Sequence, residues 1–198
     1  MFRSSKKFVP TYIIIILNLI VYAYTSILGG NAMETSYEVL LLYGQVNYFV
    51  LYWGWYWQLF TAIFVHVNIM HLLGNMFFLL IFGLRAEEFF SIKEYLLIYL
   101  LSGLAGNMLT LLLPLTTVSA GASGAIFGLF GACTIYFRRA VGQSIVSALM
   151  FSFFLLIISA GLNVNILAHL GGLVVGLLIG YLLASTRSKM VYEYRYSI

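Results

Sequence analysis

The feature this chain most lacks is charge. Only 8% of its 198 residues are charged, whereas 63% are hydrophobic. A water-soluble domain carries roughly 25% charged residues, so this chain has too few to cover a surface that faces water. The composition therefore predicts that the solvent of most of the chain is a lipid bilayer.

Aspartate is missing altogether, and cysteine occurs once. The six acidic residues are all glutamates, which excludes an intramembrane aspartyl protease and leaves no aspartate for a Ser-His-Asp triad. Cys133 has no second cysteine with which to form an internal disulfide,. It lies in an apolar run, so we interpret it as a small core residue.

Long apolar runs dominate the rest of the chain. Each is close to the roughly 20 residues that a helix needs to cross the hydrocarbon core. We therefore predict an all-α polytopic membrane protein with six transmembrane helices in a single domain covering residues 1–198. The predicted spans are 9–29, 68–87, 92–113, 121–138, 143–161 and 167–185.

The basic residues predict the orientation of these spans. With six spans both termini share one side, and every Lys and Arg falls in the tails or near the turns on that side. The loops on the other side contain only Glu34 and Glu38 as charged residues. The positive-inside rule therefore places both termini in the cytoplasm. The net charge of +4 reflects this topology, and we expect no nucleic-acid partner.

The connection between the first two predicted spans is unusually apolar. It includes Trp53, Trp55, Tyr56 and Trp57, yet glycines and polar residues interrupt it too often for a seventh span. Tryptophan and tyrosine favour the interface between membrane and water. We therefore expect this first outer loop to lie half-embedded in the outer leaflet.

Several polar residues are predicted to lie at membrane depth near the outer face. His71, Ser123 and His169 all fall near the outer ends of their spans, and such costly residues usually mark function,. Ser123 is placed just inside a helix N-terminus, where unpaired N–H groups favour a developing negative charge. Asn75 follows His71 by four residues and shares its helix face.

Small residues recur every three or four positions in two of these spans. Such stripes let two helices approach closely in lipid, which is ordinary helix packing. If the two stripes meet, however, the Ser123 hydroxyl and the His169 imidazole come side by side. The stripes consist of Gly121, Gly124, Gly128 and Gly131 in the fourth span, and of Gly172, Gly176 and Gly180 in the sixth.

Together these motifs resemble the rhomboid family of intramembrane serine proteases. The resemblance rests on Gly121-Ala122-Ser123-Gly124, on His169 with the glycines that follow it, and on His66-x4-His71-x3-Asn75. Trp57-Gln58 is similar to the Trp-Arg signature of the family, with Gln58 in place of the arginine. Six spans resemble the minimal prokaryotic form, which implies a multi-pass plasma-membrane protein whose site opens to the extracytoplasmic side.

The resemblance implies a Ser-His dyad, with Ser123 as the nucleophile and His169 as its base. It also implies an oxyanion hole formed by His71, Asn75 and the backbone N–H of Ser123. Phe127 stands where the family usually has a tyrosine beneath the histidine. We expect neither a metal nor a cofactor. The residues expected to support the site are His66, Phe127, Gly121, Gly124, Gly172 and Gly176.

The function that follows is cleavage of peptide bonds in or near the transmembrane helices of other membrane proteins, with single-span proteins in the bilayer as substrates. The alternative is a catalytically silent rhomboid-like protein that binds and escorts membrane proteins. A transporter, channel or metal site built on the three histidines is a further class. It is disfavoured because no inverted repeat is evident and because no His-Glu-x-x-His motif is present,.

Overall fold

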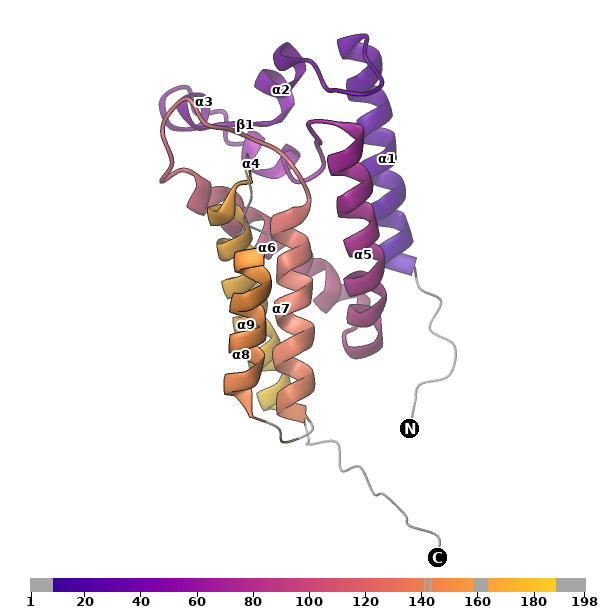
Figure 1. The fold of residues 1–198 in the computed structure, drawn as a ribbon, viewed down its shortest axis with the longest axis vertical. Helices are drawn as coiled ribbons and strands as arrows, with labels where there is room; N and C mark the ends of the chain where they lie inside the picture. Colours follow the sequence, from indigo (N-terminus) through magenta and orange to yellow (C-terminus); the bar gives the residue numbers. More distant parts are fainter. Residues whose placement is uncertain (1–8, 141, 143, 159–163, 188–198) are drawn as a thin grey trace, which may run out of the picture.

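The computed structural model describes residues 9–140, 142, 144–158 and 164–187, and helices make up most of it (Figure 1). Six long helices coincide with the six predicted apolar runs, with boundaries shifted by a few residues. The predicted end of the fifth run, 159–161, lies outside the described residues. The helices are α1 (Val9–Gly29), α5 (Ile69–Phe89), α6 (Ile92–Thr110), α7 (Ser123–Ala140), α8 (Ile145–Ile158) and α9 (Ile166–Thr186).

Side-chain caps fix where three of these helices begin. The Asn68 side chain accepts a hydrogen bond from the backbone of His71 at the start of α5. Ser91 opens α6 with a reciprocal capping box to Glu94, and Asn165 caps α9. Such caps satisfy N–H groups that the first turn of a helix leaves unpaired. Local sequence therefore determines the helix starts that precede His71 and His169.

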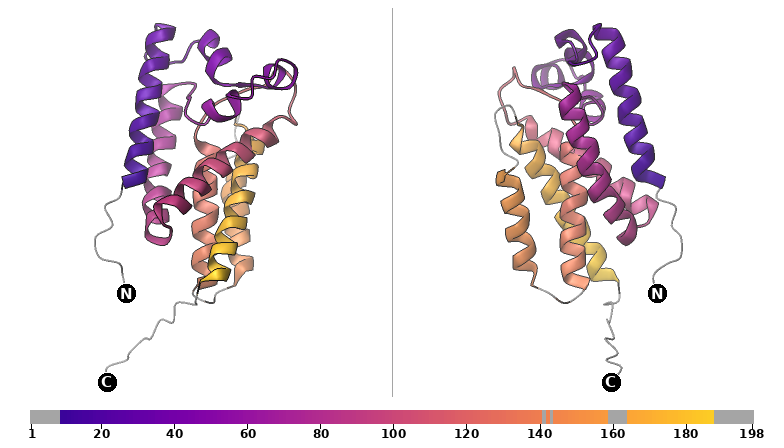
Figure 2. Two further views of the ribbon diagram at one scale, coloured as in Figure 1. Left: turned by 180° about the vertical axis from the view of Figure 1, so that it is seen from behind. Right: turned by 45° about the vertical axis from the view of Figure 1, so that its right-hand side comes forward.

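Helix α7 lies at the centre of the bundle and packs against α5, α6, α8 and α9, whereas α1 packs on the outside against α5 (Figures 1 and 2). The two glycine stripes lie against each other. A Cβ atom on Gly172 would overlap the carbonyl oxygen of Gly124, and one on Gly176 would overlap that of Gly128. Glycine at these positions therefore lets α7 and α9 touch backbone to backbone.

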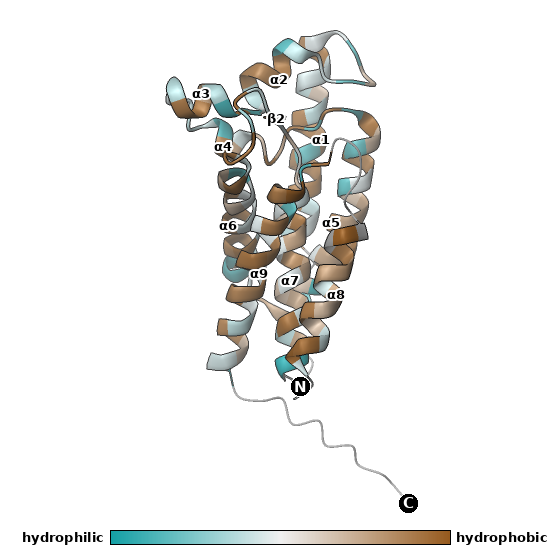
Figure 3. Ribbon diagram, turned by 60° about the vertical axis from the view of Figure 1, so that its left-hand side comes forward, coloured by the Kyte–Doolittle hydropathy of each residue, from teal (hydrophilic) through white to brown (hydrophobic). Residues whose placement is uncertain are grey.

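The prediction of six membrane crossings is supported only in part. Within the described ranges, α1, α5 and α9 are each long and apolar enough to cross a membrane, and hydrophobic residues cover much of the bundle (Figure 3). Helix α6 is less apolar because it buries Ser102, Asn107 and Thr110 against its neighbours. The start of α1 and the end of α9 lie at the same end of the bundle (Figures 1 and 2).

The first connecting segment (residues 30–68) lies across the opposite end of the bundle (Figure 1). Its short strand β1 (Gln45–Val46) pairs antiparallel with β2 (Val118–Ser119), the strand that precedes α7. The rings of Tyr52, Trp53, Tyr56 and Trp57 are at least half exposed. The described elements are α2 (Tyr37–Tyr43), β1 (Gln45–Val46), α3 (Asn47–Tyr52), α4 (Gln58–Thr61) and β2 (Val118–Ser119).

Gln58 anchors this segment from within. Its side chain is fully buried. The amide oxygen accepts a hydrogen bond from the backbone of Val46 at 2.9 Å, and the amide nitrogen donates to the Leu41 carbonyl at 2.8 Å. A neutral amide thus holds α2 and β1 together at the position where the Trp-Arg signature carries a charge.

We expect a Gln58→Leu substitution to lower the free energy of unfolding by about 1–3 kcal/mol, because it leaves a buried N–H and a buried carbonyl without partners. Thermal unfolding in detergent measures this change. Gln58→Glu should also melt below the wild type, because an ionised carboxylate at this buried position loses the donor and faces the Leu41 carbonyl,. A Gln58→Leu protein as stable as the wild type would contradict the anchoring role.

Candidate active site

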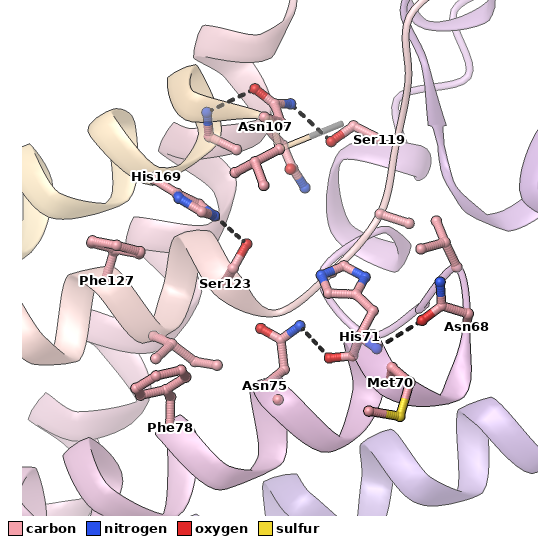
Figure 4. Close-up of a pocket in the computed structure, with 18 of the residues that line it drawn as sticks. Asn68, Met70, His71, Asn75, Phe78, Asn107, Ser119, Ser123, Phe127 and His169 are labelled. Atoms are coloured by element: carbon pink, nitrogen blue, oxygen red, sulfur yellow. Dashed lines mark hydrogen bonds between the residues drawn. The ribbon is translucent and has the colours of Figure 1, made fainter. Parts of the chain in front are cut away.

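Ser123 and His169 come together at the N-terminal ends of α7 and α9 (Figure 4). The Ser123 Oγ atom lies 2.9 Å from Nε2 of His169, which is hydrogen-bonding distance,. Ser123 is the first residue of α7, so its own N–H has no partner within the helix,. The geometry therefore places a hydroxyl, an imidazole and a helix N-terminus in one place.

Packing holds the imidazole of His169 in this orientation. Its ring stacks on that of Phe127, with centroids 4.5 Å apart and planes inclined by 20°. Phe127 lies one turn after Ser123 on α7, and only 8% of His169 is exposed. Phe127 thus lies against the histidine, as the resemblance implies, and contributes the aromatic surface without a hydroxyl.

His71 and Asn75 face the same cavity from α5 (Figure 4). The Asn75 side chain donates one N–H to the His71 carbonyl at 2.9 Å, and an amide carries a second N–H. The His71 ring lies against Gly121, where a Cβ atom would be 2.7 Å from the ring carbon Cε1. Gly121 also has a φ of +138°, which only glycine adopts readily. A side chain at this position would displace His71.

His66 lies beside His71 and is fully buried. The two rings meet edge to face with centroids 5.2 Å apart, and the Thr35 hydroxyl donates to the His66 carbonyl at 2.7 Å. Burial, and to a lesser extent the neighbouring His71, lowers the pKa of His66 to about 3. His66 is therefore neutral near neutral pH and supports the His71 ring by packing.

A cavity of about 730 Å³ contains these groups. Its polar lining includes His71, Asn75, Ser123 and His169, and its apolar lining includes phenylalanines of α5 and α7. Among the residues that the structure describes, no cluster of three or more His, Cys, Asp or Glu side chains is arranged to hold a metal ion. The cavity thus combines a hydroxyl, an imidazole and N–H donors beside an apolar surface.

Sequence reasoning did not place Asn68, Asn107, Ser119 or Asn165 at this cavity, although all four line it. Asn165 is the one that directly precedes the helix of His169. It caps α9 four residues before His169 and also lines the cavity. The signal that could have identified it is local, because asparagine just before an apolar helical run is a helix-start signature. Its contacts to distant elements have no such signal.

A family model matches the part of the chain that contains this site. The model of the rhomboid domain matches residues 54–186, which include His71, Asn75, Ser123 and His169. The chain belongs to the rhomboid family. Rhomboid membership and the apolar helices together indicate a multi-pass membrane protein.

Individual rhomboid relatives extend the match. The chain is 38% identical over 149 residues to RHOMBOID-like protein 6, mitochondrial, of Arabidopsis thaliana, which covers 71% of this chain and 48% of the relative. It is 32% identical over 178 residues to rhomboid protease GluP of Bacillus subtilis, covering 84% of this chain and 33% of the relative. Rhomboid-like protease 3 of Toxoplasma gondii is 30% identical over 174 residues, covering 82% of this chain and 65% of the relative. The chain therefore spans less than two thirds of the length of these relatives.

Proposed function

We propose that this rhomboid is a serine endopeptidase that cleaves peptide bonds in or near the transmembrane helices of other membrane proteins. The observation that carries the proposal is the 2.9 Å contact between Ser123 Oγ and His169 Nε2. His169 removes the hydroxyl proton as Ser123 attacks the scissile carbonyl, and then protonates the leaving amine. Water subsequently hydrolyses the acyl-enzyme with the same histidine as base.

Three donors around the serine would stabilise the oxyanion of the tetrahedral intermediate. They are the Ser123 backbone N–H, the second amide N–H of Asn75 and the ring of His71. The two side chains line the same cavity as Ser123. Donors that are preorganised where the charge develops are far more effective than the same groups in bulk water. This arrangement supports acyl-transfer chemistry over mere binding.

The position of the protein in the bilayer determines the conformation in which a substrate helix reaches the cavity. We propose that all six long helices cross the plasma membrane, that the termini are cytoplasmic and that the cavity opens to the extracytoplasmic side. The exposed aromatic rings of residues 30–68 would then lie half-embedded in the outer leaflet. A substrate helix has its carbonyl groups hydrogen-bonded, so it must unwind before attack. We therefore expect single-span substrates with small or helix-weakening residues near the outer face.

The direct test uses purified protein in liposomes with a single-span substrate. The wild type is expected to release two fragments, and Ser123→Ala is expected to release none above background. Addition of a chelator should leave the wild-type rate unchanged. A Ser123→Ala protein that cuts at the wild-type rate would refute the proposal.

The competing function is that of a silent rhomboid-like escort protein, which would bind membrane proteins without cutting them. A fluorophosphonate probe separates the two functions because it labels only an activated serine. Labelling of the wild type that is lost in Ser123→Ala supports the protease. An unlabelled, correctly folded wild type that still retains a membrane protein in pull-down experiments would favour the escort function.

We expect Asn75→Ala to lower kcat by about 10²- to 10³-fold, the usual effect of removing one oxyanion donor. KM should change little, because the donor acts on charge that develops in the transition state. Single-turnover cleavage in liposomes measures the rate, and thermal unfolding verifies that the variant is folded. An unchanged kcat would exclude Asn75 from the oxyanion hole.

A further inference from the structure

The side chain of Asn165 connects three elements beside the candidate active site. Its Nδ2 atom donates to the hydroxyl oxygen of Thr110 on α6 at 2.7 Å and to that of Ser119 in β2 at 2.9 Å. Its Oδ1 atom accepts from the backbone N–H of Ala168 at 3.1 Å. Both N–H donors and the carbonyl of the amide are thus in use. One side chain therefore joins α6, β2 and the N-terminus of α9.

These bonds connect the helix that carries the imidazole to the segment that carries the hydroxyl. His169 lies one turn after Asn165, and its backbone N–H donates to the Asn165 carbonyl at 3.3 Å. Ser119 is the last residue of β2 and lies four residues before Ser123. On its other side this segment is held by the Gly121 N–H, which donates to the Ala62 carbonyl at 2.8 Å. The segment before Ser123 is therefore fixed from both sides.

Glycine packing alone does not determine how the two groups meet. The contact of Gly172 with Gly124 brings the α9 and α7 backbones together, but small apolar contacts restrict sliding and rotation of a helix only weakly. Hydrogen bonds prefer N–H···O angles above about 150° and weaken steeply away from them. The bonds from Asn165 thus provide the directional restraint at the end of α9 where His169 lies.

We propose that Asn165 is a positioning residue that holds the imidazole of His169 against the hydroxyl of Ser123. This inference rests on the proposed protease function. Asn165 does not act on the substrate; it acts through the placement of α9 relative to β2 and α6. Loss of its bonds should therefore slow the chemical step and leave substrate affinity largely unchanged.

Two substitutions at this position separate positioning from helix capping. Serine is as good a helix cap as asparagine, but its side chain is too short to reach both Thr110 and Ser119. We expect Asn165→Ser to lower the melting temperature less than Asn165→Ala does, because it keeps the cap, and to lower kcat by about 10- to 100-fold with KM unchanged, as a small misplacement of catalytic groups does. Asn165→Ala should lose both stability and kcat.

A partner substitution with a matched control completes the experiment. Thr110→Val keeps the side-chain shape and removes the acceptor for Asn165, so it should lower kcat in the same way. Its control is Thr134→Val, because the hydroxyls of Thr110 and Thr134 each donate to the carbonyl four residues earlier in their own helix. Thr134→Val should retain the wild-type kcat.

The outcomes distinguish this inference from the proposed function. If the wild type is active and Asn165→Ser has the same kcat, the positioning role alone is overturned. A wild type that cleaves no more substrate than Ser123→Ala would overturn the protease function and the positioning role with it. A selective fall in kcat for Asn165→Ser and Thr110→Val, with Thr134→Val unchanged, is the result that we expect.

Discussion

Alanine at either Ser123 or His169 is expected to reduce kcat by about 10⁴- to 10⁶-fold, and the double variant is expected to lose no more than either single variant. The reason is that the two groups act as one unit. Without His169 the hydroxyl keeps its proton, and without Ser123 the imidazole has no nucleophile to activate. The Ser123 Oγ and His169 Nε2 atoms lie 2.9 Å apart, so each group depends directly on the other. Single-turnover cleavage of a single-span substrate in liposomes measures all three variants.

The control for this experiment is Ser185→Ala, which removes another serine hydroxyl from the far end of α9, where it bonds the Tyr181 carbonyl. This variant should keep the wild-type rate. If the losses in Ser123→Ala and His169→Ala multiply in the double variant, the two residues act independently and the dyad is wrong.

Gly172→Ala is expected to remove activity and to destabilise the fold together. The added Cβ atom would overlap the carbonyl oxygen, carbonyl carbon and Cα atom of Gly124, which are backbone atoms that cannot turn aside. The two helices must therefore separate. Overpacking of a core typically lowers the free energy of unfolding by about 1–3 kcal/mol, and occasionally by more. Because Gly124 is next to Ser123 and Gly172 is three residues after His169, this separation also opens the dyad. A misplacement of 1 Å can cost about 10²-fold in rate.

Gly74→Ala provides a matched glycine substitution within a helix. A Cβ atom at Gly74 would meet nothing within 4 Å, so the variant should be as stable as the wild type, or more stable by up to about 1 kcal/mol because alanine favours the helix. Thermal unfolding in detergent compares the two variants. Equal melting temperatures for Gly172→Ala and Gly74→Ala would show that close backbone packing of α7 and α9 is not required.

The helices themselves could be predicted because their signals are local. Runs of apolar residues identified each long helix, and the glycine stripes indicated which faces of α7 and α9 would meet. The number of membrane crossings is a weaker prediction for a physical reason. The polar and small residues that α6 and α7 bury against their neighbours reduce the hydropathy by which a span is identified. Figure 3 shows hydrophobic residues spread over much of the bundle.

The amino-acid sequence by itself determined the chemical groups of this rhomboid, namely a serine at the start of one glycine-rich helix, a histidine in the first turns of another, and no aspartate. Only the tertiary structure decided that Ser123 and His169 lie within hydrogen-bonding distance, that Phe127 stacks on the imidazole and that Asn165 joins three elements. Those contacts link residues far apart in the chain. Their geometry depends on how whole helices pack, and no local pattern records it.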